Sequence, residues 1–313
     1  MSYSEQAIDF CCAHDTLVGV LGVPESAASL GVVVVVGGPQ YRAGSHRQFV
    51  LLCRALAAAG IATLRFDYRG MGDSSGEHRD FSNASADIAA AIDALQRQLP
   101  SVTRVCLWGL CDGASAALLY CQDTGDRRVS GLCLLNPWVR SDASLARAQV
   151  KHYYGQRLRQ KEFWVKLLSG QVAGAALAGL WRNLRAMGAS ASASASASAS
   201  ASAGPSSPSG PSGASGASGN AFGGDRQRPF QQRMAQAWQG FGGQVLLLLS
   251  GDDYTAKEFL EYVAMDKAWA GLLDQAHVLR CDLPQADHTF SNAQARSQVE
   301  ALTLDWLQSR VAA

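Results

Sequence analysis

Residues 105–116 read VCLWGLCDGASA, and this stretch decides the fold of the chain. Four apolar residues typical of a buried strand run into Gly109-Leu110-Cys111-Asp112-Gly113, and small residues suited to a helix follow. This order of strand, sharp turn and helix is the pattern of a nucleophile elbow, with cysteine where serine is more common. The two glycines leave room for the close approach of strand and helix. The stretch therefore predicts a nucleophilic thiol at Cys111.

The segments around the elbow alternate between strand and helix patterns. An opening hairpin is expected at 7–12 and 17–22, and buried strands are expected at 31–36, 61–66, 102–108, 129–135, 245–249 and 277–281. Apolar residues at helical spacing predict helices at 45–59, 85–99, 113–121, 255–270 and 292–311. Such alternation predicts an α/β fold with a mostly parallel, doubly wound sheet, in which ligands bind at the carboxyl ends of the strands.

Residues 139–243 differ in character from the sheet segments on either side. Their first part is basic and aromatic with a helical pattern, and an alternating Ala-Ser tract followed by a Gly/Pro/Ser segment fills 188–220. That composition cannot bury enough apolar surface to fold, so a disordered linker is expected there. The sequence thus predicts a core at 1–138 and 244–313 with a helical lid, 139–243, inserted between them.

The composition excludes several classes of protein. The 313 residues are 48% hydrophobic with a formal net charge of +1, which does not suit a general nucleic-acid-binding surface. No apolar run approaches the roughly 20 residues of a transmembrane segment, and the N-terminus does not match a signal peptide. The eight cysteines show neither zinc-site spacing nor the density of a disulfide scaffold. No metal or cofactor is expected, and the expected location is the reducing cytoplasm.

An acid and a histidine follow the elbow, which gives nucleophile–acid–histidine, one of the chain orders in which catalytic triads occur. Asp252 and Asp253 come directly after the expected strand 245–249, and His288 follows the last expected strand. Because the carboxyl ends of parallel strands meet at one edge of a sheet, these groups are expected to meet Cys111. His288 would take the thiol proton, and the acid would orient its imidazole. Asp253 is the preferred acid and Asp252 the alternative, since the sequence does not separate adjacent residues in a turn.

The loop Gly37–Gly44, which reads GGPQYRAG, is expected to supply part of an oxyanion hole. The backbone N–H of Asp112, the residue after the nucleophile, would be the other donor. Proline has no N–H, which leaves Gln40 as the preferred loop donor and Tyr41 as the second choice.

Each candidate residue also has an ordinary structural interpretation. Cys111 could be an inert buried thiol and His288 a surface histidine, but the elbow and the place of the histidine after the last strand favour the catalytic interpretation. The basic run 151–166 is expected to be a solvated helix face. The remaining histidines are expected to be structural, and they are His14, His46, His78, His152 and His277.

The motifs GGPQYRAGSHR, FDYRGMGDSSG, GLCDGAS, KHYYGQRL, FWVKLLSG, SGDDYTAKEF and ADHTF span the chain apart from the Ala/Ser/Gly/Pro tract. Together they resemble the exosortase A system-associated hydrolase 1 family. The resemblance implies an α/β-hydrolase fold, with Cys111, Asp253 and His288 at the triad positions. It also implies a link to bacterial exopolysaccharide gene clusters and to the exosortase/PEP-CTERM sorting system. The cysteine elbow is similar to that of dienelactone hydrolases as well, but their short chain without a lid fits this one less well.

Two classes of function follow. The first is a hydrolase that cleaves an ester or thioester of a small-molecule or acyl substrate through an acyl-enzyme, with acyl transfer as a variant if a lid excludes water. The second is a non-catalytic partner of exopolysaccharide or exosortase components, because a fold by itself does not prove activity. The complete order of nucleophile, acid and histidine favours the first.

Overall fold

The structure is a computed structural model that describes residues 2–26, 28–38, 40–140 and 228–312. The chain divides into two compact units, one of Met1–Arg140 with Asn220–Ala313 and one of Ser141–Gly219. The expected lid helices before residue 228 and the linker at 188–220 lie outside the described residues, so these expectations stay predictions.

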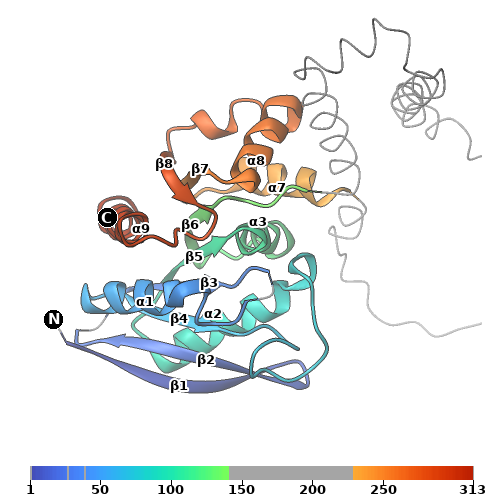
Figure 1. Ribbon diagram of the computed structural model, residues 1–313. Helices are drawn as coiled ribbons and strands as arrows, with labels where there is room; N and C mark the ends of the chain where they lie inside the picture. Colours follow the sequence, from blue (N-terminus) through green and yellow to red (C-terminus); the bar gives the residue numbers. More distant parts are fainter. Residues whose placement is uncertain (1, 27, 39, 141–227, 313) are drawn as a thin grey trace, which may run out of the picture. The chain divides into compact units, whose positions relative to one another are not determined.

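An eight-stranded sheet forms the centre of the first of these units (Figure 1). Its strands lie in the order β1-β2-β4-β3-β5-β6-β7-β8. The first two form an antiparallel hairpin, β2 pairs antiparallel with β4, and the strands from β4 to β8 pair in parallel. The predicted mostly parallel sheet is therefore confirmed. The strands are β1 Tyr3–Cys12, β2 Asp15–Pro24, β3 Leu30–Val35, β4 Ala62–Phe66, β5 Arg104–Leu110, β6 Val129–Leu135, β7 Gln244–Asp252 and β8 Val278–Asp287.

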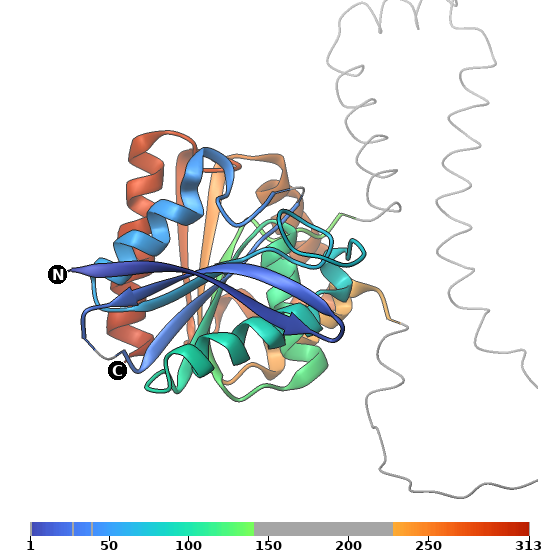
Figure 2. The ribbon, with the colours of Figure 1, turned by 90° about the horizontal axis from the view of Figure 1, so that it is seen from below.

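Helices cover both faces of the sheet, as Figure 2 shows for α1 and α9 on one face and α2 on the other. Buried side chains of α1 and α9 belong to one hydrophobic cluster, and those of α2, α3, α7 and α8 belong to a second. The sheet is thus doubly wound, with a core on each side. The helices are α1 Gln48–Ala58, α2 Ser85–Gln98, α3 Asp112–Thr124, α7 Phe230–Gly240, α8 Tyr254–Met265 and α9 Ala293–Trp306.

The valine run of β3 shows why the sheet is buried on both faces. Successive side chains of a strand point to opposite sides. Val33 and Val35 accordingly join the cluster beneath α2 and α3, whereas Val32 and Val34 join the cluster beneath α1 and α9. Every residue of β3 is buried. If polar and apolar residues alternated along this strand, the polar side chains would lie in one of the two cores, and the continuous apolar run avoids this.

The helix α7 belongs to the core unit, although the sequence suggested that the lid extends to residue 243. Met234 and Trp238 of this helix are fully buried, and Gln231 donates a hydrogen bond from Nε2 to the carbonyl oxygen of Val139 at 3.0 Å. The boundary expected at residue 243 therefore differs from the division of the chain into units, which groups α7 with the core. An amphipathic helix has the same pattern whether it packs in a lid or on a sheet.

Several elements differ in length from the predicted ones. The strands β5 and β7 run two and three residues further than expected, to Leu110 and Asp252. The α-helix expected at 45–59 begins at Gln48, because His46 and Arg47 take left-handed backbone conformations with φ of 53° and 59°. As a result, β5 ends directly before Cys111 and β7 ends directly before Asp253, at the candidate site.

Candidate active site

Cys111 occupies the sharp turn between β5 and α3. Its φ of 61° and ψ of −125° lie in a region that residues other than glycine seldom adopt. A Cβ atom at Gly109 would collide with the backbone of Gly113 and Ala114, and one at Gly113 would collide with the carbonyl oxygen of Val35. Both glycines of the motif are therefore required by the close contact between helix and strands.

His288 lies in the loop after β8 and faces Asp253. Its Nδ1 is 2.9 Å from Oδ2 of Asp253. The Asp253 carboxylate also caps α8, because it accepts hydrogen bonds from the backbone N–H groups of Thr255 at 3.0 Å and Ala256 at 3.2 Å. The side chain of Asp253 is 6% exposed, whereas Asp252 ends β7 as an exposed residue. The structure thus brings the imidazole to Asp253.

Hydrogen bonds to its two neighbours raise the pKa of His288 to about 10. The bond to Asp253 contributes most and the bond to Cys111 comes next, while burial acts in the opposite direction. Burial raises the pKa of Asp253, but its bonds to His288 and to the N–H groups of α8 outweigh burial, and the pKa is lowered overall. At neutral pH, His288 is therefore an imidazolium that faces the carboxylate of Asp253. The same imidazolium also makes a hydrogen bond to the Cys111 sulfur.

The carboxylate of Asp112 turns back toward the loop after β3. Its Oδ1 accepts a hydrogen bond from the backbone N–H of Gly38 at 2.5 Å, and it also accepts from its own N–H and from that of Gly113. Burial raises the pKa of Asp112, and the three N–H bonds and the charge of His288 oppose this increase without cancelling it. The start of α3 and the loop after β3 therefore direct their N–H groups to one point.

The loop donors expected from the sequence lie in different surroundings. Gln40 lines the same cavity as Cys111, and its Oε1 accepts a hydrogen bond from the N–H of Ser45 at 3.2 Å. Tyr41 is exposed. The N–H that points to Asp112 comes from Gly38, which sequence reasoning missed. No sequence signal singles out this group, because the direction of each N–H in a glycine-rich loop depends on the loop's conformation.

Arg42 fastens the loop after β3 to the loop after β4. Its backbone N–H donates to Oδ1 of Asp67 at 2.6 Å, and its guanidinium contacts Oδ2 of the same residue. The guanidinium also pairs with Asp73 at 2.5 Å. Asp67 is fully buried, while the side chain of Asp73 is 67% exposed. The buried carboxylate is therefore the one that fixes the position of the loop.

Asn136, directly after β6, connects β7, which leads to Asp253, with the loop that carries His288. Its Nδ2 donates to Oγ of Ser250 at 2.9 Å and to the carbonyl oxygen of His288 at 3.2 Å, and its Oδ1 accepts from the N–H of Ser250 at 2.8 Å. Its φ is 44°, a conformation that asparagine tolerates better than most residues. The sequence analysis assigned no role to Asn136, which directly follows the expected strand 129–135. An asparagine directly after a buried strand was the available signal.

A cavity of about 400 Å³ opens onto Cys111 and His288 at the carboxyl edge of the sheet. Phe49, Leu110 and Trp138 form its apolar walls. Ligand sites of proteins commonly combine such walls with a few convergent polar groups. The cavity therefore combines apolar walls with the polar groups of Cys111 and His288.

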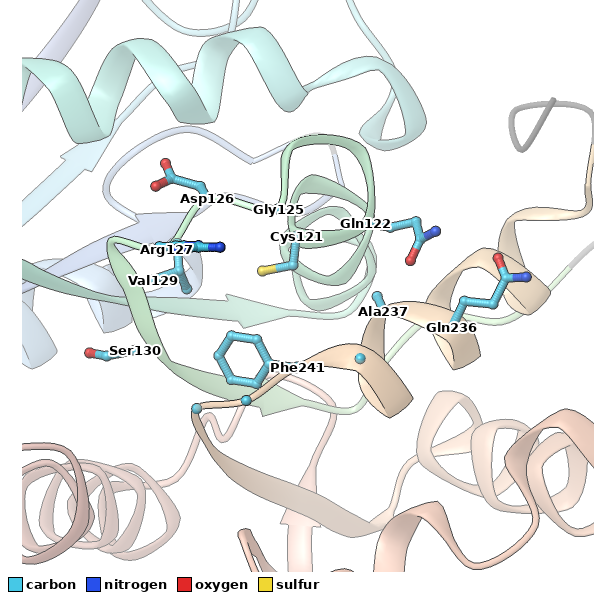
Figure 3. Close-up of a pocket in the computed structure, with 13 residues that line it drawn as sticks. Cys121, Gln122, Gly125, Asp126, Arg127, Val129, Ser130, Gln236, Ala237 and Phe241 are labelled. Atoms are coloured by element: carbon cyan, nitrogen blue, oxygen red, sulfur yellow. The ribbon is translucent and has the colours of Figure 1, made fainter. Parts of the chain in front are cut away.

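A larger cavity, of about 540 Å³, lies near the amino ends of β6 and β7 (Figure 3). Residues from the end of α3, the start of β6 and the end of α7 line it, and Figure 3 shows Cys121 and Phe241 among them. Burial raises the pKa of Cys121 to about 12, so this thiol stays protonated at neutral pH. Of the described residues, no histidine lines this cavity. Cys111 and His288 therefore line the smaller cavity together.

Neither a metal centre nor a membrane span is found in the described part of the chain. Its His, Cys, Asp and Glu side chains form no group of three or more that could hold a metal ion. Within the same residues, no helix has both the length and the apolar character that crossing a bilayer requires.

Two comparisons at the level of sequence cover parts of the chain. The family described as serine aminopeptidase, S33, matches residues 28–179, a range that includes the elbow but ends before β7. The human protein ABHD12B is 34% identical over 86 residues, which make up 28% of this chain and 23% of that protein. The matched part of this chain thus spans about a quarter of the length of that relative.

Similarity to solved structures extends over nearly the whole chain. An esterase from Pyrococcus furiosus is 12% identical, with 99% of this chain and 94% of that chain covered and a TM-score of 0.60. Est1E from Butyrivibrio proteoclasticus, solved with ferulic acid bound, is 15% identical with coverages of 98% and 100% and a TM-score of 0.58. A dienelactone hydrolase from Anabaena variabilis is 14% identical with coverages of 99% and 100% and a TM-score of 0.57. The chain therefore has the fold of the α/β-hydrolase superfamily.

Proposed function

We propose that this protein is a hydrolase that cleaves an ester or thioester through an acyl-enzyme, with Cys111 as nucleophile, His288 as general base and Asp253 as the acid that orients the base. The observation that carries the proposal is the hydrogen-bonded series from Asp253 through His288 to Cys111 at the turn before α3. A nucleophile, a base and an orienting acid in hydrogen-bond contact are the geometric requirement for this chemistry.

The charge state of the series suits a thiol nucleophile. His288 is in hydrogen-bond contact with the Cys111 sulfur and can hold the proton that the nucleophile gives up. The thiolate forms a bond to the carbonyl carbon, and the carbonyl π electrons move to the oxygen. When the tetrahedral intermediate collapses, the imidazolium gives its proton to the leaving group. The neutral imidazole then takes a proton from the water that hydrolyses the acyl-enzyme, and Asp253 keeps the ring in place throughout.

The oxyanion of each intermediate requires N–H donors at the start of α3. The backbone N–H of Asp112 is one such donor, and the loop after β3 supplies the second, either Gln40 as the sequence predicts or Gly38 as the direction of its N–H supports. Donors held in place before the reaction stabilise the developing charge without reorganisation.

The apolar cavity walls and the motif resemblance support a narrower proposal for the substrate. Phe49, Leu110 and Trp138 suit an acyl chain or another apolar acyl group. The resemblance to the exosortase A system-associated hydrolases supports a cytoplasmic role in exopolysaccharide production or PEP-CTERM sorting. An acyltransferase would use the same three residues and differ only in the acceptor that attacks the acyl-enzyme.

Selective alkylation tests the nucleophile. All eight cysteines are free thiols, and the exposed Cys11 serves as an internal standard for ordinary reactivity. At neutral pH, iodoacetamide followed by peptide mass spectrometry should label Cys111 much faster than Cys11, and His288→Ala should slow the labelling of Cys111. Burial raises the pKa of the other six thiols, which are Cys12, Cys53, Cys106, Cys121, Cys133 and Cys281. Equal labelling of Cys111 and Cys11 would overturn the proposal.

An acyl panel tests the reaction itself. Incubation with p-nitrophenyl esters and with thioesters should give a burst of product and an acyl adduct on Cys111, and Cys111→Ala should abolish both. Mass spectrometry of the adduct formed in a native cell extract would then identify the acyl group. A reactive Cys111 that forms no adduct with any ester or thioester would favour a non-catalytic partner protein instead.

A further inference from the structure

The carboxylate of Asp112 accepts a hydrogen bond from the backbone N–H of Gly38, and Gly38, Asp112 and Cys111 line the same cavity. The carboxylate also accepts hydrogen bonds from the backbone N–H groups of Gly113 and of Asp112 itself. The contact is close, because a Cβ atom at Gly37 would collide with Oδ1 of Asp112. The N–H groups of Asp112 and Gly38 are donors that the proposed acyl chemistry can use, and in this arrangement the protein's own anion engages them.

A carboxylate at this point opposes acylation in two ways. An N–H group that already donates to a carboxylate is not free to stabilise a second anion. The negative charge of Asp112 would also repel the developing oxyanion at short range, and such repulsion is strong in a partly buried cavity. Acylation at Cys111 therefore requires a second arrangement in which the Asp112 carboxylate has left these donors.

Tyr68, in the loop after β4, offers the carboxylate another partner. Its side chain is buried, with 3% exposed, and its hydroxyl has no hydrogen-bond partner among the described residues. Burial, and then the charges of Asp112 and Asp87, raise the pKa of Tyr68. The oxygens of Asp87 already accept three hydrogen bonds from Arg69. Asp112 is thus the acceptor available to an otherwise unpaired buried hydroxyl.

We propose that Asp112 is a displaceable occupant of the oxyanion site. In the resting protein its carboxylate accepts the N–H bonds of Gly38 and of the start of α3. During acylation it turns to accept a hydrogen bond from the Tyr68 hydroxyl, and the N–H groups then hold the oxyanion that forms as the Cys111 sulfur bonds to the carbonyl carbon. The inference rests on the proposed function, since it concerns the same nucleophile and the same intermediate.

The test compares two reactions of one sulfur. Acylation by p-nitrophenyl butyrate forms an oxyanion and alkylation by iodoacetamide does not, so the ratio of the two rate constants at Cys111 reports the state of the oxyanion site. Asp112→Ala should raise this ratio about tenfold, because each donor of an oxyanion hole has a large effect on the acyl step. Asp112→Asn keeps the shape without the charge, and the ratio should rise less. The second variant also serves if the first does not fold.

Tyr68→Phe tests whether the Asp112 carboxylate turns toward the Tyr68 hydroxyl, because this variant removes the hydroxyl and keeps the ring. This variant removes only a buried oxygen without a described partner, so it should fold normally and lower the acylation ratio. In the double variant Asp112→Ala/Tyr68→Phe that loss should disappear, because no carboxylate remains for the hydroxyl to hold. A structural role of Tyr68 would persist in the double variant, and such a result would overturn the coupling.

Formate gives a direct probe of the vacated site. Asp112→Ala should become sensitive to inhibition of acylation by formate, which replaces the missing carboxylate, while the wild-type protein should not. A ratio that falls in Asp112→Ala would overturn the inference and show that the carboxyl group assists the reaction. A ratio that is unchanged in Asp112→Ala, with Cys111 acylated in both proteins, would overturn the inference alone. Rapid alkylation of Cys111 without acylation in either protein would count against the proposed function as well. Alkylation of Cys111 no faster than that of Cys11 would overturn the proposed function and this inference together.

Discussion

His288 pairs with Asp253 and not with the adjacent Asp252. The imidazole Nδ1 lies 2.9 Å from Oδ2 of Asp253, and Asp252 is the exposed last residue of β7. Successive side chains of an extended chain point to opposite sides. Asp253 has extended φ and ψ of −140° and 131°, so a single residue separates a carboxylate in the site from one in solvent.

Replacement of each aspartate distinguishes the two positions. Asp253→Asn removes the charge that contributes to the raised pKa of His288, so this pKa should fall toward its ordinary value near 6.5, and alkylation of Cys111 near neutral pH should slow by about tenfold. An NMR titration of the His288 ring measures the first effect, and iodoacetamide labelling measures the second. Asp252→Asn is the matched control and should change neither. Equal effects of the two variants would contradict the assignment.

The raised pKa of His288 predicts how its contribution to stability changes with pH. Because the folded protein holds the proton more tightly than the unfolded chain, this contribution is fully present below the unfolded pKa of about 6.5. It should decline as the pH rises above that value and should be lost as the pH passes the folded pKa of about 10. Urea denaturation of the wild-type protein and of His288→Gln should show a difference in free energy of unfolding that shrinks between pH 6.5 and 10. A difference that stays constant over this range would contradict the shift.

Asn136 should be important for both stability and reactivity. Asn136→Ala removes the acceptor of the buried Ser250 N–H and the donor to the His288 carbonyl, which should cost about 2–4 kcal/mol of stability. Labelling of Cys111 should slow as well, since the loop that carries His288 loses an anchor. Asn136→Gly, which suits the positive φ, separates backbone strain from lost hydrogen bonds. The exposed Asn83 provides a control, because Asn83→Ala should change stability by less than about 1 kcal/mol. Similar stability of the Asn136 and Asn83 alanine variants would refute the anchoring role.

The two carboxylates that contact Arg42 should differ in importance. Asp67→Asn weakens a fully buried pair and the fixation of the loop that carries Gly38, so it should cost about 3 kcal/mol in free energy of unfolding. Asp73→Asn alters an exposed pair, and such pairs contribute about 0–1 kcal/mol. Chemical denaturation of both variants measures the contrast. The interpretation fails if Asp73→Asn destabilises the protein as much as Asp67→Asn does.

The hydrophobic pattern was sufficient for the buried elements. The strand β6 has its predicted bounds of Val129–Leu135, because a continuous apolar run between turn residues has one interpretation in an alternating α/β chain. The ends of β5 and β7 were predicted too short, since pairing with neighbouring strands continues through residues such as Gly109 and Asp252 that carry no strand signal. The position of α7 depends on long-range packing against α3, which no local pattern reveals.

Motif order predicted which residues of the site follow which strands, but not how their polar groups are directed. Cys111 and His288 follow strands that meet at one edge of the sheet, and topology alone brings them near each other. The choice of Asp253 over Asp252 depends on a helix cap, and the roles of Gly38 and Asn136 depend on hydrogen bonds between distant loops. Such hydrogen bonds depend on the tertiary structure, so they cannot be predicted from the composition of the chain or from the spacing of its motifs.

The positive φ of Cys111 implies that thermal stability and thiol reactivity place opposite demands on this residue. A side chain in this backbone region costs about 1–3 kcal/mol, and glycine would adopt the same turn without that strain. Cys111→Gly should therefore withstand heat better than Cys111→Ala, although both lack the sulfur. A directed-evolution search for thermal resistance alone would thus tend to remove the thiol, and any such search must select for reactivity at the same time.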